Sequence, residues 1–333
     1  MTAPGRFWDT VGRDVRADGC GRCEEGRGRV LRTVGRPGRR AVALAGVVAM
    51  ALSGCQAQSS IVPAHRDDPV AVIETASFGE AEIVGHIYGN ALVRSGSRVT
   101  ARPQSGTQAE VVESVVAGDA TFTVGFTGEL LGAFDPGATA TEGDEVYAAM
   151  MAALPEGVTA ADPAPAEDAP VYVVTRNTSE TRGLRTMSDL AGRCGDLTLG
   201  ARQEALADGD LAAAVGETYD CGFGRRIPLG PNPRAVFDAL RAGEIGVGLV
   251  QSADPVGLPE DIVTLDDDEN AVRAQNLVPV FRKGSLSEDQ LSLINRISGE
   301  LTTDDVRELL LGVEFGTSTP VALANYWLDS HGY

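Results

Sequence analysis

Short apolar runs alternate with amphipathic stretches from residue 70 onward. The runs at 70–75, 98–101 and 121–126 are rich in β-branched residues and predict strands. The stretches at 80–95 and 107–117 repeat apolar residues at helical spacing and predict helices. Because strands and helices alternate, the pattern favours an α/β sheet in which neighbouring strands are parallel.

A second series with the same alternation follows, and the chain then ends in helices. We expect, in order, a strand at 171–175, a short helix at 188–190, a strand at 197–199, helices at 208–219 and 233–242, and strands at 245–250 and 278–281. Three terminal helices, at 287–299, 303–311 and 319–329, each begin at a Ser or Thr that can cap the first turn. The stretch 159–170 is rich in Pro, Ala and acidic residues and is expected to be a loop.

This order of elements predicts two α/β lobes. The length of 333 residues is enough for about two domains. We expect residues 70–176 and 271–333 to form the first lobe and residues 177–270 to form the second. A ligand would then lie in the cleft between the lobes, at the carboxyl ends of the strands.

The N-terminal region is typical of an exported lipoprotein. Twin Arg residues precede a 12-residue apolar run at 41–52, which is too short to span a bilayer. The run leads into Leu52-Ser-Gly-Cys55, which resembles a bacterial lipobox, in which the cysteine thiol receives a diacylglycerol. We therefore expect a signal peptide at 1–54 with an over-extended start, lipidation of Cys55, a polar tether at 55–69, and anchoring to the outer face of the cell membrane. The alternative is an ordinary secretory signal with a chance cysteine.

Charge narrows the range of partners. The chain has a formal net charge of −19, and without residues 1–54, which hold 10 Arg and 5 acidic residues, it carries 18 basic against 42 acidic residues, or −24. A surface this negative repels phosphate backbones and anionic headgroups, so we expect no nucleic-acid partner and membrane contact only through the lipid anchor. It favours cationic or zwitterionic small ligands.

Two cysteines remain in the exported part beside the lipidated one. Cys194 and Cys221 would meet an oxidising compartment, where a pair of thiols usually forms a disulfide. Closing a loop of this length would stabilise the fold by roughly 3 kcal/mol. The alternative is two buried free thiols.

No motif for catalysis or metal binding is evident. The chain lacks a Gly-x-Ser-x-Gly elbow, a phosphate-binding loop and a metal-ligand cluster, so we expect neither an enzyme nor a cofactor. The acidic run 266–269 lacks the spacing and the Gly of a calcium loop and is expected to be a solvated turn. The three histidines have no metal spacing, and Cys20 and Cys23 have no second Cys/His pair.

Several segments together resemble one family of binding proteins. Gln275-Asn-Leu-Val-Pro-Val-Phe-Arg282 stands where that family has Tyr-Asn-x-x-Pro-Val-Val-Arg, and Met187-Ser-Asp-Leu190 stands where it has Ile-Ser-Asp-Leu. Further matching segments, in order along the chain, are 75–84, 104–107, 116–129, 237–243, 251–254 and 264–268. Over about residues 70–330 the chain resembles the glycine betaine, choline and proline betaine (osmoprotectant) substrate-binding lipoproteins of ABC importers. The resemblance implies a two-lobed type II periplasmic-binding-protein fold, of the venus-flytrap kind.

The expected ligand cleft departs from the family pattern. Family members hold a trimethylammonium group in a cage of aromatic faces. Here Phe126 replaces a Tyr, and Gln251 and Gln275 stand at two further Tyr positions, which suggests recognition by hydrogen bonds. The candidate ligand-binding residues are Ser77, Phe78, Thr107, Phe126, Gln251, Ser252, Asp254 and Gln275.

Each candidate also has a structural alternative. Phe78 and Phe126 could be core residues, and Thr107 could be a plain helix cap instead of a carboxylate-binding site. Ser252 and Asp254 could contact ligand or the hinge, or could cap a turn before Pro255.

The resemblance implies capture without chemistry. We expect an extracytoplasmic protein that binds a betaine-like or choline-like osmolyte between its lobes and presents it to a separate permease subunit. The alternative is an orphan lipoprotein of the same fold, sensing a polar solute or binding a protein partner.

Overall fold

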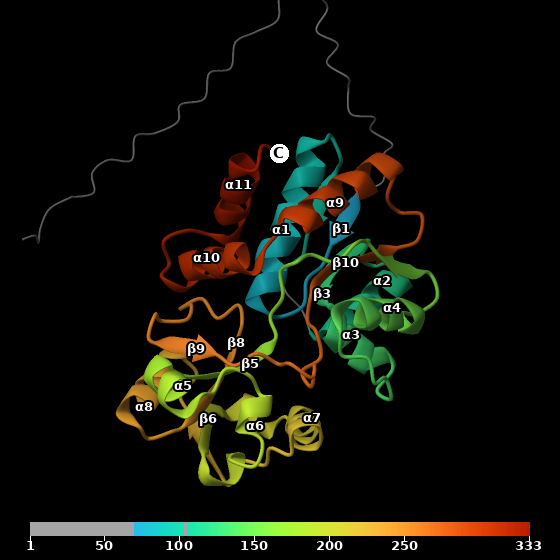
Figure 1. Ribbon diagram of the computed structural model, residues 1–333. Coiled ribbons are helices and arrows are strands. Elements are labelled where there is room, and N and C mark those ends of the chain that lie inside the picture. Colours follow the sequence, from blue (N-terminus) through green and yellow to red (C-terminus); the bar gives the residue numbers. More distant parts are fainter. Residues whose placement is uncertain (1–69, 103–105) are drawn as a thin grey trace, which may run out of the picture. The chain divides into compact units, whose positions relative to one another are not determined.

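The computed structural model describes residues 70–102 and 106–333, which contain two five-stranded mixed sheets flanked by helices (Figure 1). The strand order is β2-β1-β3-β10-β4 in the first sheet and β7-β6-β8-β5-β9 in the second. The expected signal peptide, the lipidation site Cys55 and the tether lie outside the described residues, as do Gln104 and Ser105 of the second family motif.

The first sheet is built from both ends of the described chain. Its strands are β1 (Ala71–Ile73), β2 (Val99–Ala101), β3 (Phe122–Phe126), β4 (Val158–Ala160) and β10 (Leu277–Arg282). Its helices are α1 (Gly79–Arg94), α2 (Gln108–Ala117), α3 (Thr127–Phe134), α4 (Gly143–Ala153), α9 (Glu288–Glu300), α10 (Thr303–Glu314) and α11 (Pro320–Ser330). β1 pairs in parallel with β2 and β3, as expected, whereas the returning strand β10 is antiparallel to β3 and β4.

The second sheet lies between these two parts in the sequence. Its strands are β5 (Pro170–Thr175), β6 (Thr198–Arg202), β7 (Arg225–Leu229), β8 (Val247–Gln251) and β9 (Ile262–Thr264). Its helices are α5 (Arg176–Arg182), α6 (Gln203–Ala207), α7 (Gly209–Tyr219) and α8 (Arg234–Ala242), with 3₁₀ turns at Ser188–Leu190 and Cys194–Asp196. The expected lobe boundary after residue 176 differs from the sheet pairing, because β5 pairs with β8 and β9 of the second sheet.

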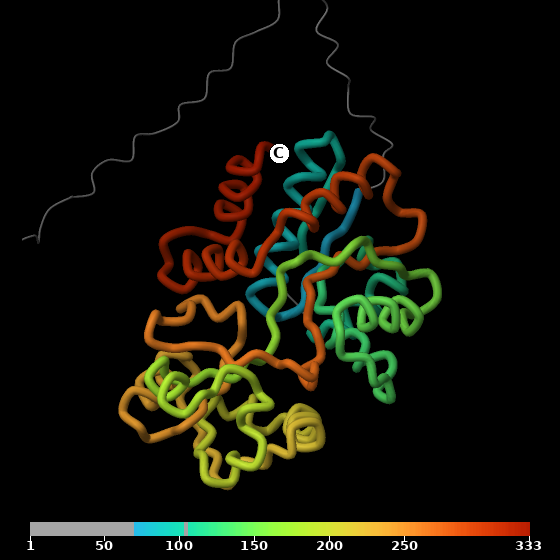
Figure 2. Tube along the Cα trace, viewed as in Figure 1, coloured from blue at the N-terminus to red at the C-terminus, as the bar shows by residue number. Residues whose placement is uncertain are grey.

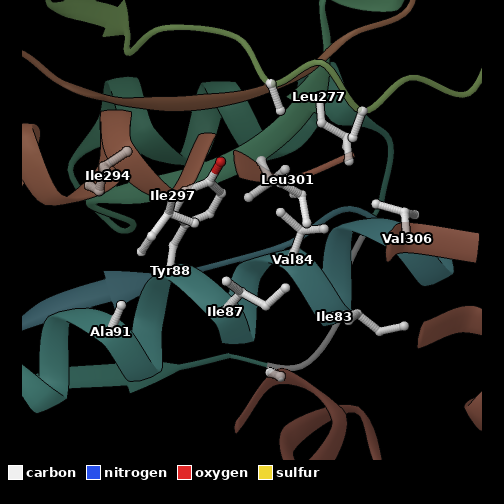
Figure 3. Packing of buried hydrophobic residues seen from close by; sticks show 14 of the residues in the cluster. Ile83, Val84, Ile87, Tyr88, Ala91, Leu277, Ile294, Ile297, Leu301 and Val306 are labelled. Carbon is white, nitrogen blue, oxygen red and sulfur yellow. The ribbon is translucent and has the colours of Figure 1, made fainter. Parts of the chain in front are cut away.

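Helix α1 lies at the centre of the hydrophobic core that it forms with β10, α9 and α10 beside the first sheet. Its apolar residues recur at spacings of three and four and therefore lie on one face. Figure 3 shows this face pointing toward side chains of α9, α10 and β10; the labelled residues are Ile83, Val84, Ile87, Tyr88, Ala91, Leu277, Ile294, Ile297, Leu301 and Val306. The Tyr88 hydroxyl is satisfied at 2.8 Å by the Ser298 hydroxyl, and Tyr88 is fully buried. Tyr88 is thus a core residue.

The second core carries the predicted disulfide. Cys194 and Cys221 are bonded, with their Cα atoms 5.2 Å apart, and both are buried. The bond joins the 3₁₀ turn before β6 to the segment before β7. The prediction of a Cys194–Cys221 pair is confirmed.

Two segments connect the sheets, and they run side by side. Residues 161–169 lead from β4 to β5, and residues 265–276 lead from β9 back to β10 (Figure 2). Glu167 and Asn276 form an antiparallel bridge, and the Asp168 N–H donates to the Gln275 carbonyl at 3.1 Å. We call these two segments the crossover pair.

Among the described residues no helix has the length and apolar character needed to cross a bilayer.

Candidate functional site

A cavity of about 570 Å³ opens beside the crossover pair. It is lined by residues that follow β1 and β3, by the start of α2, by the crossover pair, and by the ends of β8 and α6. The lining residues are Ala76, Ser77, Phe78, Glu80, Gly106, Thr107, Gln108, Phe126, Glu129, Asp168, Pro170, Asp208, Gln251 and Gln275. Six of the eight candidate residues line this cavity: Ser77, Phe78, Thr107, Phe126, Gln251 and Gln275.

Two phenyl rings form an apolar wall of the cavity. Phe78 is the N-cap residue of α1, and Phe126 ends the buried strand β3. Their ring centroids lie 5.0 Å apart with an interplanar angle of 26°, a stacked arrangement. The Phe126 N–H is held by the Gln108 side-chain oxygen at 2.7 Å, which fixes the end of the strand. The rings therefore serve packing and the cavity wall together.

The glutamines at the two family Tyr positions both reach neighbouring groups. The Gln275 side-chain oxygen accepts from the Glu129 backbone N–H at 3.0 Å, which ties the crossover pair to the start of α3. The Gln251 amide lies 3.5 Å from an Asp168 carboxylate oxygen, a long contact. Both glutamines thus line the cavity with amide groups, which can donate and accept hydrogen bonds.

Thr107 caps α2 in a complete capping box. Its hydroxyl accepts from the Glu110 N–H at 3.3 Å, and its own N–H donates to the Glu110 carboxylate at 2.7 Å. This reciprocal pairing uses donors that a bound carboxylate would need. Of the two alternatives for Thr107, the structure shows the helix cap.

Ser252 and Asp254 lie outside the cavity lining. The Ser252 hydroxyl accepts from the Ala169 N–H at 3.0 Å, and Asp254 accepts from the Gln251 N–H at 3.0 Å. Arg307 of α10 also donates to the Ser252 carbonyl at 2.6 Å. These residues therefore hold the turn after β8 against the crossover pair and against α10.

Sequence reasoning missed the acidic side of the cavity. Glu80, Glu129, Asp168 and Asp208 line it, and no Lys, Arg or His is among its lining residues. They come from four places: the first turns of α1 and α3, the crossover pair, and the N-cap of α7. Only Glu80 had a signal in the sequence, because it completes the Phe-x-Glu element of the first family motif.

Burial shifts the titration of the two inner carboxyl groups. It raises the pKa of Glu80 to about 7, with a further contribution from the negative charge of Asp168. It raises the pKa of Asp168 to about 6, although the Ala253 N–H, at 2.9 Å, favours the charged form. Among residues 70–102 and 106–333, neither carboxylate has a cationic partner within ion-pair distance. The same residues include no group of three acidic, His or Cys side chains that could hold a metal ion.

Comparison with known families shows to which family of proteins this chain belongs. Residues 69–330 match the family model described as the substrate-binding domain of ABC-type glycine betaine transport systems. The chain belongs to this family. Members are substrate-binding proteins that work with an ABC permease, and the expected resemblance is confirmed.

Solved structures agree on the fold of this family member. A glycine betaine/carnitine/choline ABC transporter protein is 23% identical, with a TM-score of 0.69 over 79% of this chain and 99% of its own. Apo YehZ from Escherichia coli is 17% identical, with a TM-score of 0.65 over 79% of this chain and 98% of its own. A lactococcal protein in a closed conformation with glycine betaine is 16% identical, with a TM-score of 0.51 over 80% of this chain and 97% of its own. The predicted two-lobed type II periplasmic-binding-protein fold is confirmed.

Proposed function

We propose that this protein is the extracytoplasmic solute receptor of an ABC importer, and that it captures a small osmolyte-type ligand, betaine-like or choline-like, in the cavity beside the crossover pair. The observation that carries the proposal is this cavity, with a stacked phenyl wall formed by Phe78 and Phe126 and four acidic side chains in its lining. An apolar wall with a few charged groups is typical of small-molecule sites. The negative carboxylates and the faces of the phenyl rings both attract a positively charged ligand head.

Capture would proceed by hinge motion without chemical change. The crossover pair is the covalent link between the two sheets, and a few backbone torsions there can absorb a closing movement. A ligand that contacts both sides would stabilise the closed form, which a permease could then distinguish from the open form.

Lipid anchoring at Cys55 is a second part of the proposal. It is supported by the basic flank, the apolar run and the small residues before Cys55. Cells expressing the protein should incorporate a labelled fatty acid into it, and Cys55→Ser should abolish incorporation. Labelling that persists in Cys55→Ser would contradict lipidation at this residue.

Thermal stability with added solutes tests the capture function. A ligand that binds the folded state raises the melting temperature by mass action. We expect the purified full-length chain to respond to at least one of choline, glycine betaine, carnitine, proline, ectoine, ethanolamine or putrescine. No response to any of them would contradict solute capture in this cavity.

A pair of phenylalanine variants tests whether the rise in melting temperature comes from binding in this cavity. Phe78→Leu should weaken it because Phe78 lines the cavity, whereas Phe315→Leu should leave it unchanged. Phe315 is a suitable control because its side chain is 61% exposed on a different surface, beyond the end of α10.

A further inference from the structure

The cavity presents more negative charge than a zwitterionic ligand can use. Among its described lining residues four are acidic and none is basic, and Arg202 acts on Glu80 and Asp168 only from outside the lining. At pH 8, above the pKa values of Glu80 and Asp168, a betaine carboxylate entering this space would meet repulsion from these two carboxylates, and like charges inside a site are a strong basis for rejection. The start of α2 offers little compensation, because Thr107 and Glu110 satisfy each other there. The starts of α1 and α3 have no side-chain cap, but each carries an acidic lining residue, Glu80 or Glu129, in its first turn.

The four carboxylates differ in how far the protein already satisfies them. Asp208 accepts the Leu211 N–H at 2.9 Å as a helix cap, and Glu129 accepts the Gln108 amide at 2.5 Å. Asp168 accepts the Ala253 N–H. Glu80 has only its own backbone N–H as a partner among the described residues. Glu80 is therefore the carboxylate with the most unused capacity to accept hydrogen bonds.

A quaternary ammonium ion would leave that capacity unused. It carries charge but has no N–H to donate, so partly buried carboxylates beside it lose water without gaining hydrogen bonds. A protonated primary or secondary amine supplies both the charge and the donors, and charge-assisted hydrogen bonds are the stronger kind. The phenyl wall formed by Phe78 and Phe126 can pack against the alkyl part of such a ligand.

We propose that the cavity selects a protonated alkylamine that lacks a carboxylate, with Glu80 and Asp168 as its principal acceptors. This inference rests on the proposed solute-capture function, and within it an amine with N–H donors takes the place of the betaine-like or choline-like head. Glu80 stands on α1 of the first lobe, while Asp168 is hydrogen-bonded to Ala253 in the turn that follows β8 of the second sheet. An amine held by both carboxylates would link the two sides of the cavity.

Calorimetric titration of the full-length chain at pH 8 tests the ligand class. The probes are putrescine, ethanolamine, choline and glycine betaine, which differ in N–H donors and net charge. We expect putrescine or ethanolamine to bind at least about tenfold more tightly than choline and glycine betaine. Tighter binding of choline or glycine betaine would overturn the amine inference and leave solute capture intact. Binding of none of the four would overturn the amine inference, and solute capture would fall with it only if all seven solutes of the thermal-stability test gave no response.

Isosteric amides test the two acceptors. Glu80→Gln and Asp168→Asn should each weaken amine binding by about tenfold or more. The matched controls are Glu82→Gln on the same helix and Asp162→Asn on the same crossover segment, since neither residue lines the cavity. Both controls should bind like the wild type. Unchanged amine binding in Glu80→Gln and Asp168→Asn, with melting confirming folded proteins, would overturn the assignment.

Discussion

At the scale of single residues, Glu80 illustrates a conflict between stability and binding. Its pKa is about 7 in the folded chain and 4.5 in an unperturbed side chain. Below pH 4.5 the group is protonated in both states. Between pH 4.5 and 7 the unfolded chain releases the proton while the folded chain retains it, so the stability contribution of Glu80 is lost as pH rises through this window.

Replacement of Glu80 by Gln should therefore stabilise the unliganded protein in a pH-dependent manner. At pH 8 we expect the free energy of unfolding to increase by about 1 to 3 kcal/mol, because the buried anion is removed. At pH 4 the variant and the wild type should be nearly equal. Urea denaturation at both pH values measures the difference, and equal stability at pH 8 would show that Glu80 is not held in an unfavourable environment.

The same carboxyl group should make amine binding depend on pH. Asp168, Asp254 and Arg202 act electrostatically on Glu80, and burial raises the pKa of Glu80 to about 7 and the pKa of Asp168 to about 6. Putrescine keeps its charge in this range, as Lys does. Affinity measured by titration should rise between pH 5.5 and 8, because a cation binds the ionised carboxylates. In Glu80→Gln the part of the rise near pH 7 should disappear; a rise of the same size in that variant would assign the dependence elsewhere.

At the scale of elements, helix starts place much of the cavity lining. Phe78 and Thr107 are the N-cap residues of α1 and α2, and Phe126 precedes α3. Chain segments that leave a strand and enter a helix thus bring side chains to the carboxyl edge of the sheet, as in other α/β sites. A substitution in one of these helix caps should for this reason change ligand binding in the cavity.

Variants in two capping boxes of the same type can distinguish an effect on stability from an effect on ligand binding. Thr107→Ala removes the cap of α2 and Thr302→Ala removes the cap of α10, and each should cost about 1 kcal/mol in the free energy of unfolding. Only Thr107 lines the cavity, so only Thr107→Ala should weaken ligand binding as well. Chemical denaturation and titration of both variants provide the two measurements. Equal losses of affinity would indicate a general effect of destabilisation.

At the scale of the whole molecule, local patterns predicted most of the elements but not α3 to α6, β4, β7 or β9, and long-range pairing decided where the strands go. The stripe Leu291, Ile294 and Ile297 identified α9, and the capped terminal helices lie where they were expected. β7 was missed because its sequence holds two Arg and a Pro, a poor strand pattern. The assignment of β5 to the second sheet depends on pairing with β8 and β9, about 75 and 90 residues further along the chain, which no local spacing encodes.

In the candidate site, too, some residues could be predicted from local sequence motifs, whereas others are brought together only by the tertiary fold. The Phe78 and Phe126 positions could be found because they lie in family motifs with a fixed order. The acidic set as a group could not, since only Glu80 lies in a recognised element of a family motif, and Glu129, Asp168 and Asp208 are far apart in the sequence and share no spacing. Their common location follows from the tertiary fold, which brings the crossover pair and the N-cap of α7 to the same cavity as the first turns of α1 and α3.

Closure of the lobes is the property of the whole molecule that links this site to transport. If the ligand is held by Glu80 on one side and Asp168 on the other, its binding energy favours the conformation in which these two carboxylates are closest. Small-angle scattering of the full-length chain should then show a smaller radius of gyration with saturating ligand than without it. The double variant Glu80→Gln, Asp168→Asn should keep the larger value at the same ligand concentration, while Glu82→Gln should contract like the wild type. A ligand that binds with full affinity and leaves the scattering of the wild type unchanged would show that the two carboxylates act within an already closed cavity, and hinge closure would then have to be abandoned as the signal to a permease.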